Sequence, residues 1–340
     1  MQVFLSTVIR GAPVDEGGEL ISLDWKTKKV LARVPICPPP PMVSDENTRG
    51  GCRGGRGIVV FPNEIFVATY HTLLGFTWDL KPTRTITHNN FSGLHELKRV
   101  DDGVWVTSTP LGATIKVDLQ GKVVDQWWAH DDRVVHREFG VNTLALDKSA
   151  DNRLAVVEDT DKSKLHLNNV EVHDGRVYIS LNNHGAVLRL FPTEVVAHRP
   201  ELKGCHNGLI APGGELLLNN SHHHTLIVFD LHTGEIRRQL NLAELPGVER
   251  LLAANRYKGV PLRTRLWNFI IRKRLSRPLF NRGMCVLDDS RVLIGVSPAS
   301  VLEIDFQSGK LLDLCQVSDA VNECVHGLEA IPSLDNPSAR

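Results

Sequence analysis

The stretch GRGIVVFPNEIFVATY, residues 55–70, decides the fold because its pattern recurs along the chain. A polar entry residue precedes an alternating apolar segment, a tight turn and a second alternating segment. The same form returns in LHELKRVDDGVWVTST (94–109), LNNVEVHDGRVYISLN (167–182), CHNGLIAPGGELLLNN (205–220) and NRGMCVLDDSRVLIGV (281–296), and VHGLEAIP (325–332) begins a sixth copy. Alternation with a period of two residues is the mark of half-buried strands, so each full copy predicts an antiparallel strand pair.

The spacing of the copies predicts a repeat architecture. Their entry residues are Arg56, His95, Asn168, Asn207, Arg282 and His326, so the separations are 39, 73, 39, 75 and 44 residues. Three of these match the period of propeller blades, about 40–45 residues, and the other two contain insertions of about 35 residues. Further hairpins follow the copies, as in TLIVFDLHTGEIRRQLNL (225–242), which indicates four antiparallel strands per repeat.

The two ends of the chain complete the count. The C-terminal copy supplies only one strand, and the N-terminal segments MQVFLSTVIRG (1–11), GGELISLDW (17–25) and KKVLARVPI (28–36) supply three more. A blade shared in this way closes the ring and removes exposed sheet edges. The sequence therefore predicts an all-β, six-bladed propeller that forms a single domain over residues 1–340.

Three long crossovers between repeats are expected, at residues 37–55, 130–164 and 244–280. In a four-stranded antiparallel blade the crossover lies on the face where the first strand starts, so all three should lie at the mouth of the central channel. Long loops there are typical of lids and binding segments. Of the 15 histidines, all except His173 and His232 fall on this same face, and imidazole both binds metals and transfers protons near neutral pH.

Composition narrows the class of protein. The counts of Lys plus Arg and of Asp plus Glu are both 39, so no overall charge favours nucleic acid. No apolar run reaches the length of a membrane-spanning helix, and the N-terminal residues lack the features of a signal peptide. The six cysteines form no CxxC pair, and several lie in predicted strands as small apolar residues. A reduced, cytoplasmic setting is the expectation.

Three stretches carry a family resemblance. HNGLIAPGGELLLNNS, LNNVEVHDGRVYISLN and HGLEAIP resemble repeats of the six-bladed propellers of the gluconolactonase, senescence-marker-protein and strictosidine-synthase-like group. In the lactonase-like members one divalent ion is held on the axis by a Glu, two Asn and an Asp. Matched motif by motif, the resemblance implies that these ligand positions are His326, Asn168, Asn207 and Asn220. It further implies that His95, followed by Glu96, takes a substrate-binding position.

The chain departs from that pattern at both carboxylate ligands, which neutral side chains replace. Calcium affinity follows ligand charge, so imidazole and amide ligands favour zinc, iron or another transition metal over calcium. The catalytic Asp of the family has no matching residue here. Glu96, His206 and His184 are the candidates for moving a proton, with Glu96 and His206 preferred and His184 also expected to contact substrate. Arg56 and Arg282, at entry positions, predict an anionic small-molecule substrate.

The insertion at residues 248–282 is strongly basic and contains interleaved apolar residues, including Trp267. Such a segment is compatible with a solvated lid helix, with a lid that grips substrate, with an acidic partner, or with an anionic membrane surface. The glycine-rich GGCRGGRG near residue 50 lacks the Lys-Ser/Thr ending of a phosphate-binding loop.

Three functions remain open on these grounds. The first is a small-molecule enzyme, a metal-dependent hydrolase of a lactone or ester, with its site formed by the axial His, Asn and Arg residues. The second is a non-catalytic binding or scaffold propeller that uses its loops and the basic insertion. The third is a histidine-ligated iron enzyme with oxidative chemistry, which requires at least three converging imidazoles.

Overall fold

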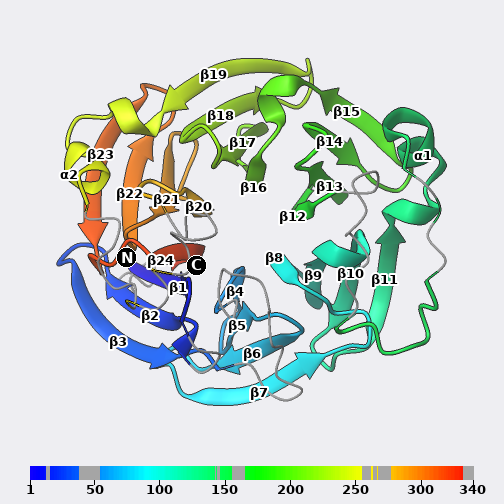
Figure 1. Cartoon of the computed structure of the whole chain (residues 1–340), viewed down its shortest axis with the longest axis horizontal. Coiled ribbons are helices and arrows are strands. Elements are labelled where there is room, and N and C mark those ends of the chain that lie inside the picture. Colours follow the sequence, from blue (N-terminus) through cyan, green and yellow to red (C-terminus); the bar gives the residue numbers. More distant parts are fainter. Residues whose placement is uncertain are drawn as a thin grey trace. The chain divides into compact units, whose positions relative to one another are not determined.

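The computed structural model describes residues 1–12, 16–37, 54–141, 143, 146–154, 165–254, 262, 266 and 277–331. Six four-stranded antiparallel sheets form a six-bladed β-propeller, which confirms the fold predicted from the repeats (Figure 1). The chain divides into two compact units, the first formed by Met1–Val67, Gly75–Thr83 and Leu240–Arg340, and the second by Ala68–Leu74 and Arg84–Gln239. The prediction that residues 1–340 form one domain stays a prediction.

Two complete sheets belong to the first unit. In sheet order, one consists of β24 (Glu323–Ile331), β1 (Gln2–Ile9), β2 (Glu19–Asp24) and β3 (Lys29–Pro35). The other consists of β20 (Arg282–Val286), β21 (Arg291–Val296), β22 (Ser300–Asp305) and β23 (Lys310–Gln316). The antiparallel pairing of β24 with β1, which places Leu5 opposite Leu328, confirms that the N- and C-terminal segments share a blade.

A further sheet contains β4 (Ile58–Val60), β5 (Ile65–Ala68), β6 (Thr72–Phe76) and β7 (Pro82–Thr87), whose residues are divided between the units. Short helices complete the first unit: α2 (Glu249–Leu252) and the 3-10 turn Leu242–Glu244. Most of the predicted insertion at 37–55 and most of the basic segment at 248–282 lie outside the described residues.

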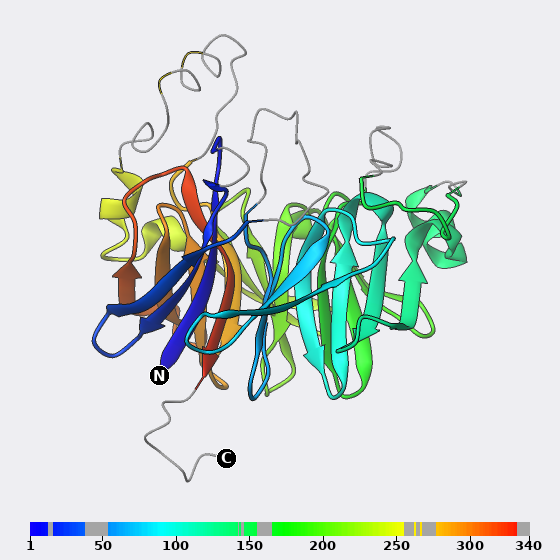
Figure 2. The ribbon, with the colours of Figure 1, turned by 90° about the horizontal axis from the view of Figure 1, so that it is seen from below.

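The second unit holds three consecutive sheets, drawn in cyan to green in Figures 1 and 2. Their strands are β8 (Leu94–Val100), β9 (Gly103–Ser108), β10 (Ala113–Asp118) and β11 (Val123–Trp128); β12 (Leu167–His173), β13 (Arg176–Leu181), β14 (Ala186–Arg189) and β15 (Glu194–His198); and β16 (Cys205–Ile210), β17 (Glu215–Asn220), β18 (Thr225–Asp230) and β19 (Glu235–Asn241). The unit also contains α1 (Arg133–Phe139) and the 3-10 turns Thr109–Leu111, Ala129–Asp131 and Pro200–Leu202.

Helix α1 lies within the predicted insertion at 130–164 and follows β11 after the 3-10 turn Ala129–Asp131 (Figure 1). It begins because the Asp132 side chain accepts hydrogen bonds from the backbone N–H groups of Val134 and Val135, which caps the first turn. It ends at Gly140, whose φ of 65° is a left-handed conformation that favours glycine. Residues 155–164 of this insertion lie outside the described part of the chain.

The strands of each blade are graded from buried to exposed. In β13, Val177, Ile179 and Leu181 enter a hydrophobic cluster between two blades, whereas the outermost strand β3 alternates between exposed and half-buried positions. Complete burial of each such aliphatic side chain contributes about 1.5–3 kcal/mol. The apolar strand residues thus stabilise the blades. The polar residues at the starts of the innermost strands do not contribute to this apolar packing.

Candidate functional site

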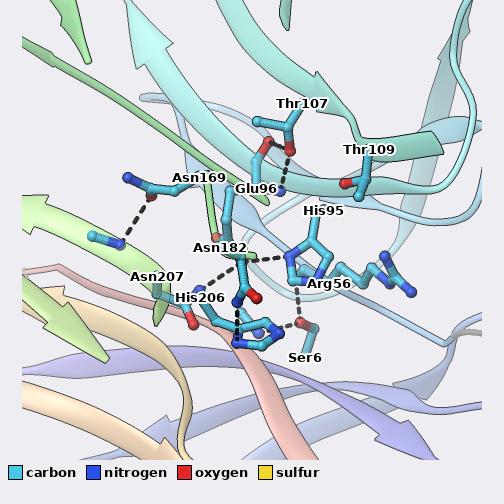
Figure 3. Close-up of polar contacts among 12 residues, drawn as sticks. Ser6, Arg56, His95, Glu96, Thr107, Thr109, Asn169, Asn182, His206 and Asn207 are labelled. Carbon is cyan, nitrogen blue, oxygen red and sulfur yellow. Dashed lines mark hydrogen bonds and ion pairs between the residues drawn. The ribbon is translucent and has the colours of Figure 1, made fainter. Parts of the chain in front are cut away.

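The starts of β8, β12 and β16 form a cluster of buried polar side chains in the second unit. These innermost strands pack side by side, β12 between the other two. The Nδ2 atom of Asn207 donates to Oε1 of Glu96 over 2.6 Å, and the backbone N–H of Gly208 donates to Oδ1 of Asn169 over 2.9 Å. Side chains therefore bind the three blades to one another at the residues that the repeat pattern singled out (Figure 3).

A β-bulge at each of these strand starts sets the direction of the polar side chains. In β8, His95 and Glu96 both lie opposite the single residue between Val106 and Ser108, because Leu94 pairs with Ser108 and Leu97 with Val106. The extra residue of β12 is Asn168, and β16 has the same shift between Cys205 and Gly208. A bulge re-aims side chains that regular alternation would send to opposite faces, and bulges are common beside functional sites.

Three histidines converge in this cluster. The ring centroids of His95 and His166 are 6.5 Å apart, those of His95 and His206 are 5.9 Å apart, and those of His166 and His206 are 5.8 Å apart. His222, just after β17, lies 6.3 Å from the His206 ring. Of these, His95 and His206 were predicted site residues, and the structure adds His166 and His222. Three imidazoles thus lie near one another in this unit, and ligation of one iron ion by all three stays a prediction.

The environment of His206 determines which ring nitrogen carries its hydrogen. Its Nδ1 atom lies 2.9 Å from the carbonyl oxygen of Gly204, 2.9 Å from Oγ of Ser221 and 3.1 Å from Nδ2 of Asn182. A carbonyl oxygen only accepts, so we infer that Nδ1 carries the hydrogen of the neutral ring. Nδ2 of Asn182 is also a donor, and it donates to the carbonyl oxygen of Cys205 over 2.7 Å. The lone pair of the His206 ring is then on Nε2, the nitrogen able to accept a proton or coordinate a cation.

Glu96 is the carboxylate of the cluster. Its side chain is 14% exposed, and Oε1 lies 3.4 Å from Nδ1 of His95, in addition to the contact with Asn207. Its backbone N–H donates to Oγ1 of Thr107 over 2.9 Å, which fixes the bulge from which the side chain projects. The predicted catalytic pair, Glu96 and His206, thus both lie around His95.

Two amides in the cluster have unsatisfied polar atoms. Asn168 is completely buried, and neither Oδ1 nor Nδ2 has a hydrogen-bond partner among the described residues. Oδ1 of Asn207 also has no hydrogen-bond partner among the described residues, although Nδ2 of the same amide donates to Glu96. An unsatisfied buried polar group costs about 1–3 kcal/mol, so each of these atoms requires a partner, which can be a ligand, an ion or an ordered water.

The other residues predicted for this unit have different surroundings. Asn220 uses Nδ2 to donate to the carbonyl oxygens of Glu201 and Lys203, and its Oδ1 accepts from the backbone N–H of His222, so it braces the loop before β16. His184 packs against Phe139 of α1 at 5.2 Å between ring centroids. Burial, followed by the charges of His198 and Lys203, lowers the pKa of His184. No contact of the described residues brings His184 to the His95 cluster.

The remaining predicted residues belong to the first unit. Arg56 precedes β4, Arg282 begins β20, and His326 lies in β24; the exposed fractions are 8%, 7% and 5%. Burial, then the guanidinium groups of Arg282, Arg56 and Arg10, hold the pKa of His326 well below its ordinary value. His326 is therefore a neutral imidazole at neutral pH. Its role as a metal ligand stays a prediction.

Sequence reasoning assigned no site role to His166, Asn182 or Ser221, although His166 was among the histidines expected on the channel face. His166 stands just before the predicted strand and has a φ of 50°, a left-handed conformation that no spacing rule reveals. Asn182 and Ser221 come just after β13 and β17, next to positions that repeat the Asn-rich ending of the second strand. The recurring "LN" and "LNN" endings were the available signal.

No helix in the described ranges is long and apolar enough to cross a membrane. No known family model and no curated protein matches the chain. Among solved structures, a protein of unknown function from Bacteroides caccae is 11% identical, with 96% of this chain and 97% of that chain covered and a TM-score of 0.59.

Two further structures are similar over nearly the whole chain. The nidogen/laminin complex contains a chain 10% identical, with 96% of this chain and 97% of that chain covered and a TM-score of 0.55. Virginiamycin B lyase from Staphylococcus aureus is 8% identical, with 97% of this chain and 99% of that chain covered and a TM-score of 0.51. One neighbour is thus a lyase and another comes from a protein complex, and at such identities the likeness shows the propeller fold alone.

Proposed function

We propose that the chain is an enzyme that hydrolyses an ester or lactone of a small molecule at the cluster around His95 in the second unit. The observation that carries the proposal is the combination of a half-buried carboxylate, Glu96, with three imidazoles and the unsatisfied amides of Asn168 and Asn207. A purely structural cluster would satisfy its buried amides within the protein. An acid–base site needs side chains that accept a proton, here Glu96 and the imidazoles. It also needs polar groups that can bind the substrate, here the amides of Asn168 and Asn207.

These residues would supply the groups that hydrolysis of an ester or lactone requires. Water attacks the carbonyl carbon of the substrate, and the carboxylate of Glu96 or Nε2 of His206 accepts the proton that this water loses. Nδ2 of Asn168, which has no hydrogen-bond partner in the described chain, would donate a hydrogen bond to the carbonyl oxygen as negative charge develops on it. When the bond between the carbonyl carbon and the alkoxy oxygen breaks, the same proton passes to the leaving oxygen. The products are a carboxylic acid and an alcohol.

A divalent cation is the second part of the proposal. Oδ1 of Asn168 and Oδ1 of Asn207 are buried oxygen donors without hydrogen-bond partners in the described chain, and His95, His166 and His206 supply imidazoles. These residues would hold the ion, and nitrogen donors favour zinc or iron over calcium. When bound, the ion would act as a Lewis acid on the carbonyl group. His326 and Asn220, implied by the family resemblance, remain predicted ligands.

The test combines metal content with turnover. The full chain, purified without chelators or a metal-affinity tag, is analysed for bound elements and assayed on a panel of lactones and aryl esters. His95→Ala and His206→Ala should lose both the metal and the activity, whereas His232→Ala, in the turn after β18, should retain both. Activity that persists in both cluster variants would contradict the proposed site.

Iron chemistry is the second candidate, because three imidazoles converge. The same elemental analysis separates the two: stoichiometric iron, with dioxygen consumption and no hydrolysis, favours oxidation. Stoichiometric zinc with hydrolysis favours the first candidate. An absence of turnover in both assays, with intact folding, would favour the binding or scaffold function.

A further inference from the structure

Three guanidinium groups face one aromatic ring in the first unit. The Cζ atom of Arg10 lies 4.2 Å from the centroid of the Phe280 ring, that of Arg282 lies 4.5 Å away, and that of Arg277 lies 5.2 Å away. Each contact is a favourable cation–π interaction, worth about 0.5–2 kcal/mol. The guanidinium groups nevertheless repel one another, and partial burial strengthens this repulsion because the local dielectric constant is low.

The backbone positions Arg56 beside the same group of residues. Oγ of Ser6 donates to the carbonyl oxygen of Arg56 over 2.5 Å and accepts from the N–H of Gly327 over 2.9 Å. A β-carbon at position 327 would lie only 2.0 Å from the Arg56 carbonyl oxygen. Glycine therefore allows β24 to approach the Arg56 segment, and this approach places His326 next to Arg56.

Arg282 approaches β24 from the neighbouring blade in a similar way. Gly283, the extra residue of a bulge in β20, has a φ of 63°. A β-carbon there would lie 2.9 Å from the carbonyl oxygen of His326. Two glycines in successive blades thus bring the strand that carries His326 close to the arginines on either side of it.

Arg10 is held by the turn after β1. Its backbone N–H donates to the carbonyl oxygen of Asn322 over 2.8 Å, and Nδ2 of Asn322 donates back to the Arg10 carbonyl oxygen over 3.1 Å. The charged groups that lower the pKa of His326 are Arg282, Arg56 and Arg10, after burial itself. Three guanidinium groups that act on one buried position would attract an anion.

We propose that Arg10 and Arg282, which face Phe280, together with Arg56, which lies beside His326, form a binding site for the oxyanion group of a small molecule, a carboxylate or a phosphate. We call the three arginines and Phe280 the arginine pocket. Guanidinium groups match both oxyanions because their parallel N–H donors pair with two oxygens at once. A bound anion would also relieve the repulsion among the three cations. The pocket lies wholly in the first unit, and its binding of an anion does not depend on the proposed hydrolysis.

Binding is tested on the full chain with inorganic phosphate and, separately, acetate, each titrated at constant ionic strength and followed by calorimetry and thermal unfolding. Saturable binding of phosphate alone identifies a phosphate site, and saturable binding of acetate alone identifies a carboxylate site; both outcomes support the proposal. Arg56→Gln and Arg282→Gln should each weaken binding at least about tenfold, the effect of losing one charge-assisted hydrogen bond. Arg238→Gln, an exposed arginine of β19, is the matched control and should bind normally.

Two further variants keep the test decisive. Arg10→Gln changes a partly exposed arginine of the pocket. It therefore tests the proposal even if Arg56→Gln and Arg282→Gln, at buried positions, do not fold. Arg282→Lys keeps the charge but loses the paired donors, and intermediate affinity is expected. The proposal is overturned if no saturable binding occurs, or if Arg10→Gln, Arg56→Gln and Arg282→Gln bind like the wild type. Because Glu96→Gln should lower hydrolysis by about a hundredfold or more and leave anion binding unchanged, failure of the proposed function is distinguishable.

Discussion

Nδ2 of Asn207 in β16 donates to Oε1 of Glu96 in β8 over 2.6 Å, although the two residues are 111 positions apart in the chain. This hydrogen bond holds the only carboxylate of the described His95 cluster in place. It also orients the amide of Asn207 so that Oδ1 is left without a hydrogen-bond partner in the described chain. A structural contact and a candidate ligand atom are thus parts of one side chain.

The substitution Glu96→Gln tests the proton-transfer role. The Gln carbonyl can still accept from Asn207, so the variant should fold normally, but it can no longer take a proton. Hydrolysis of the best substrate in the panel should fall by about a hundredfold or more, the usual contribution of a general base. The measurement is kcat/KM, with Glu235→Gln on the exposed strand β19 as the control. An unchanged rate in Glu96→Gln would remove this residue from the mechanism.

The pair Asn168→Leu and Asn169→Leu separates a ligand amide from a structural one. Asn168 has no partner for either amide atom in the described chain, so a leucine of similar size should raise the free energy of unfolding by about 1–3 kcal/mol. Asn169 accepts from Gly208, so its replacement should destabilise the protein. Chemical denaturation measures both changes. Asn168→Leu should also lose activity; a variant that is less stable yet fully active would argue against a ligand-binding amide.

Gly327→Ala tests the close approach of β24 to the Arg56 segment. The new methyl group would meet the Arg56 carbonyl oxygen at 2.0 Å, a severe overlap with backbone. The expected loss is several kcal/mol, above the roughly 1–3 kcal/mol of ordinary overpacking. Gly214→Ala is the control, because nothing lies within 4 Å of the added carbon and only its φ of 85° opposes the change. Equal losses of stability in the two variants would mean that the steric overlap at position 327 adds nothing to the cost of placing alanine in the backbone conformation of a glycine.

The pH dependence of stability should include a contribution from His326. Its pKa in the folded protein is lowered by burial and by Arg282, Arg56 and Arg10. The unfolded chain therefore binds a proton more readily, and stability falls as the pH drops below the ordinary histidine pKa of about 6.5. His326→Gln should show a smaller loss of thermal stability between pH 7.5 and pH 5 than the wild type, on the order of one titrating group.

The pH dependence of stability that remains in His326→Gln should come in part from two other histidines. Burial also lowers the pKa of His88 and, together with His198 and Lys203, that of His184. His184→Gln is therefore a useful comparison, because it removes a titrating group outside the arginine pocket. If His326→Gln and the wild type lose stability in parallel as the pH falls, the low pKa of His326 is refuted.

The amino-acid sequence alone determined the blades, because alternation and tight turns are local properties. Asp174 and Gly175, for example, both have positive φ values and form the turn between β12 and β13, as the "DG" pattern predicts. The sharing of one blade by the two ends also followed from counting strands. The entry residues His95, Asn168 and Asn207 were identified in the same way, since equivalent positions in a repeat take equivalent places in the fold.

Only the tertiary structure decided which side chains meet at those entry positions. Regular alternation would place neighbours such as His206 and Asn207 on opposite faces of β16, but the bulge lets both join the site. The bulge depends on pairing with β17 and on contact between Gly208 and Asn169 of the next blade, so no local pattern encodes it. The same is true of the arginines around Phe280: their convergence depends on the packing of separate strands, which sequence spacing does not record.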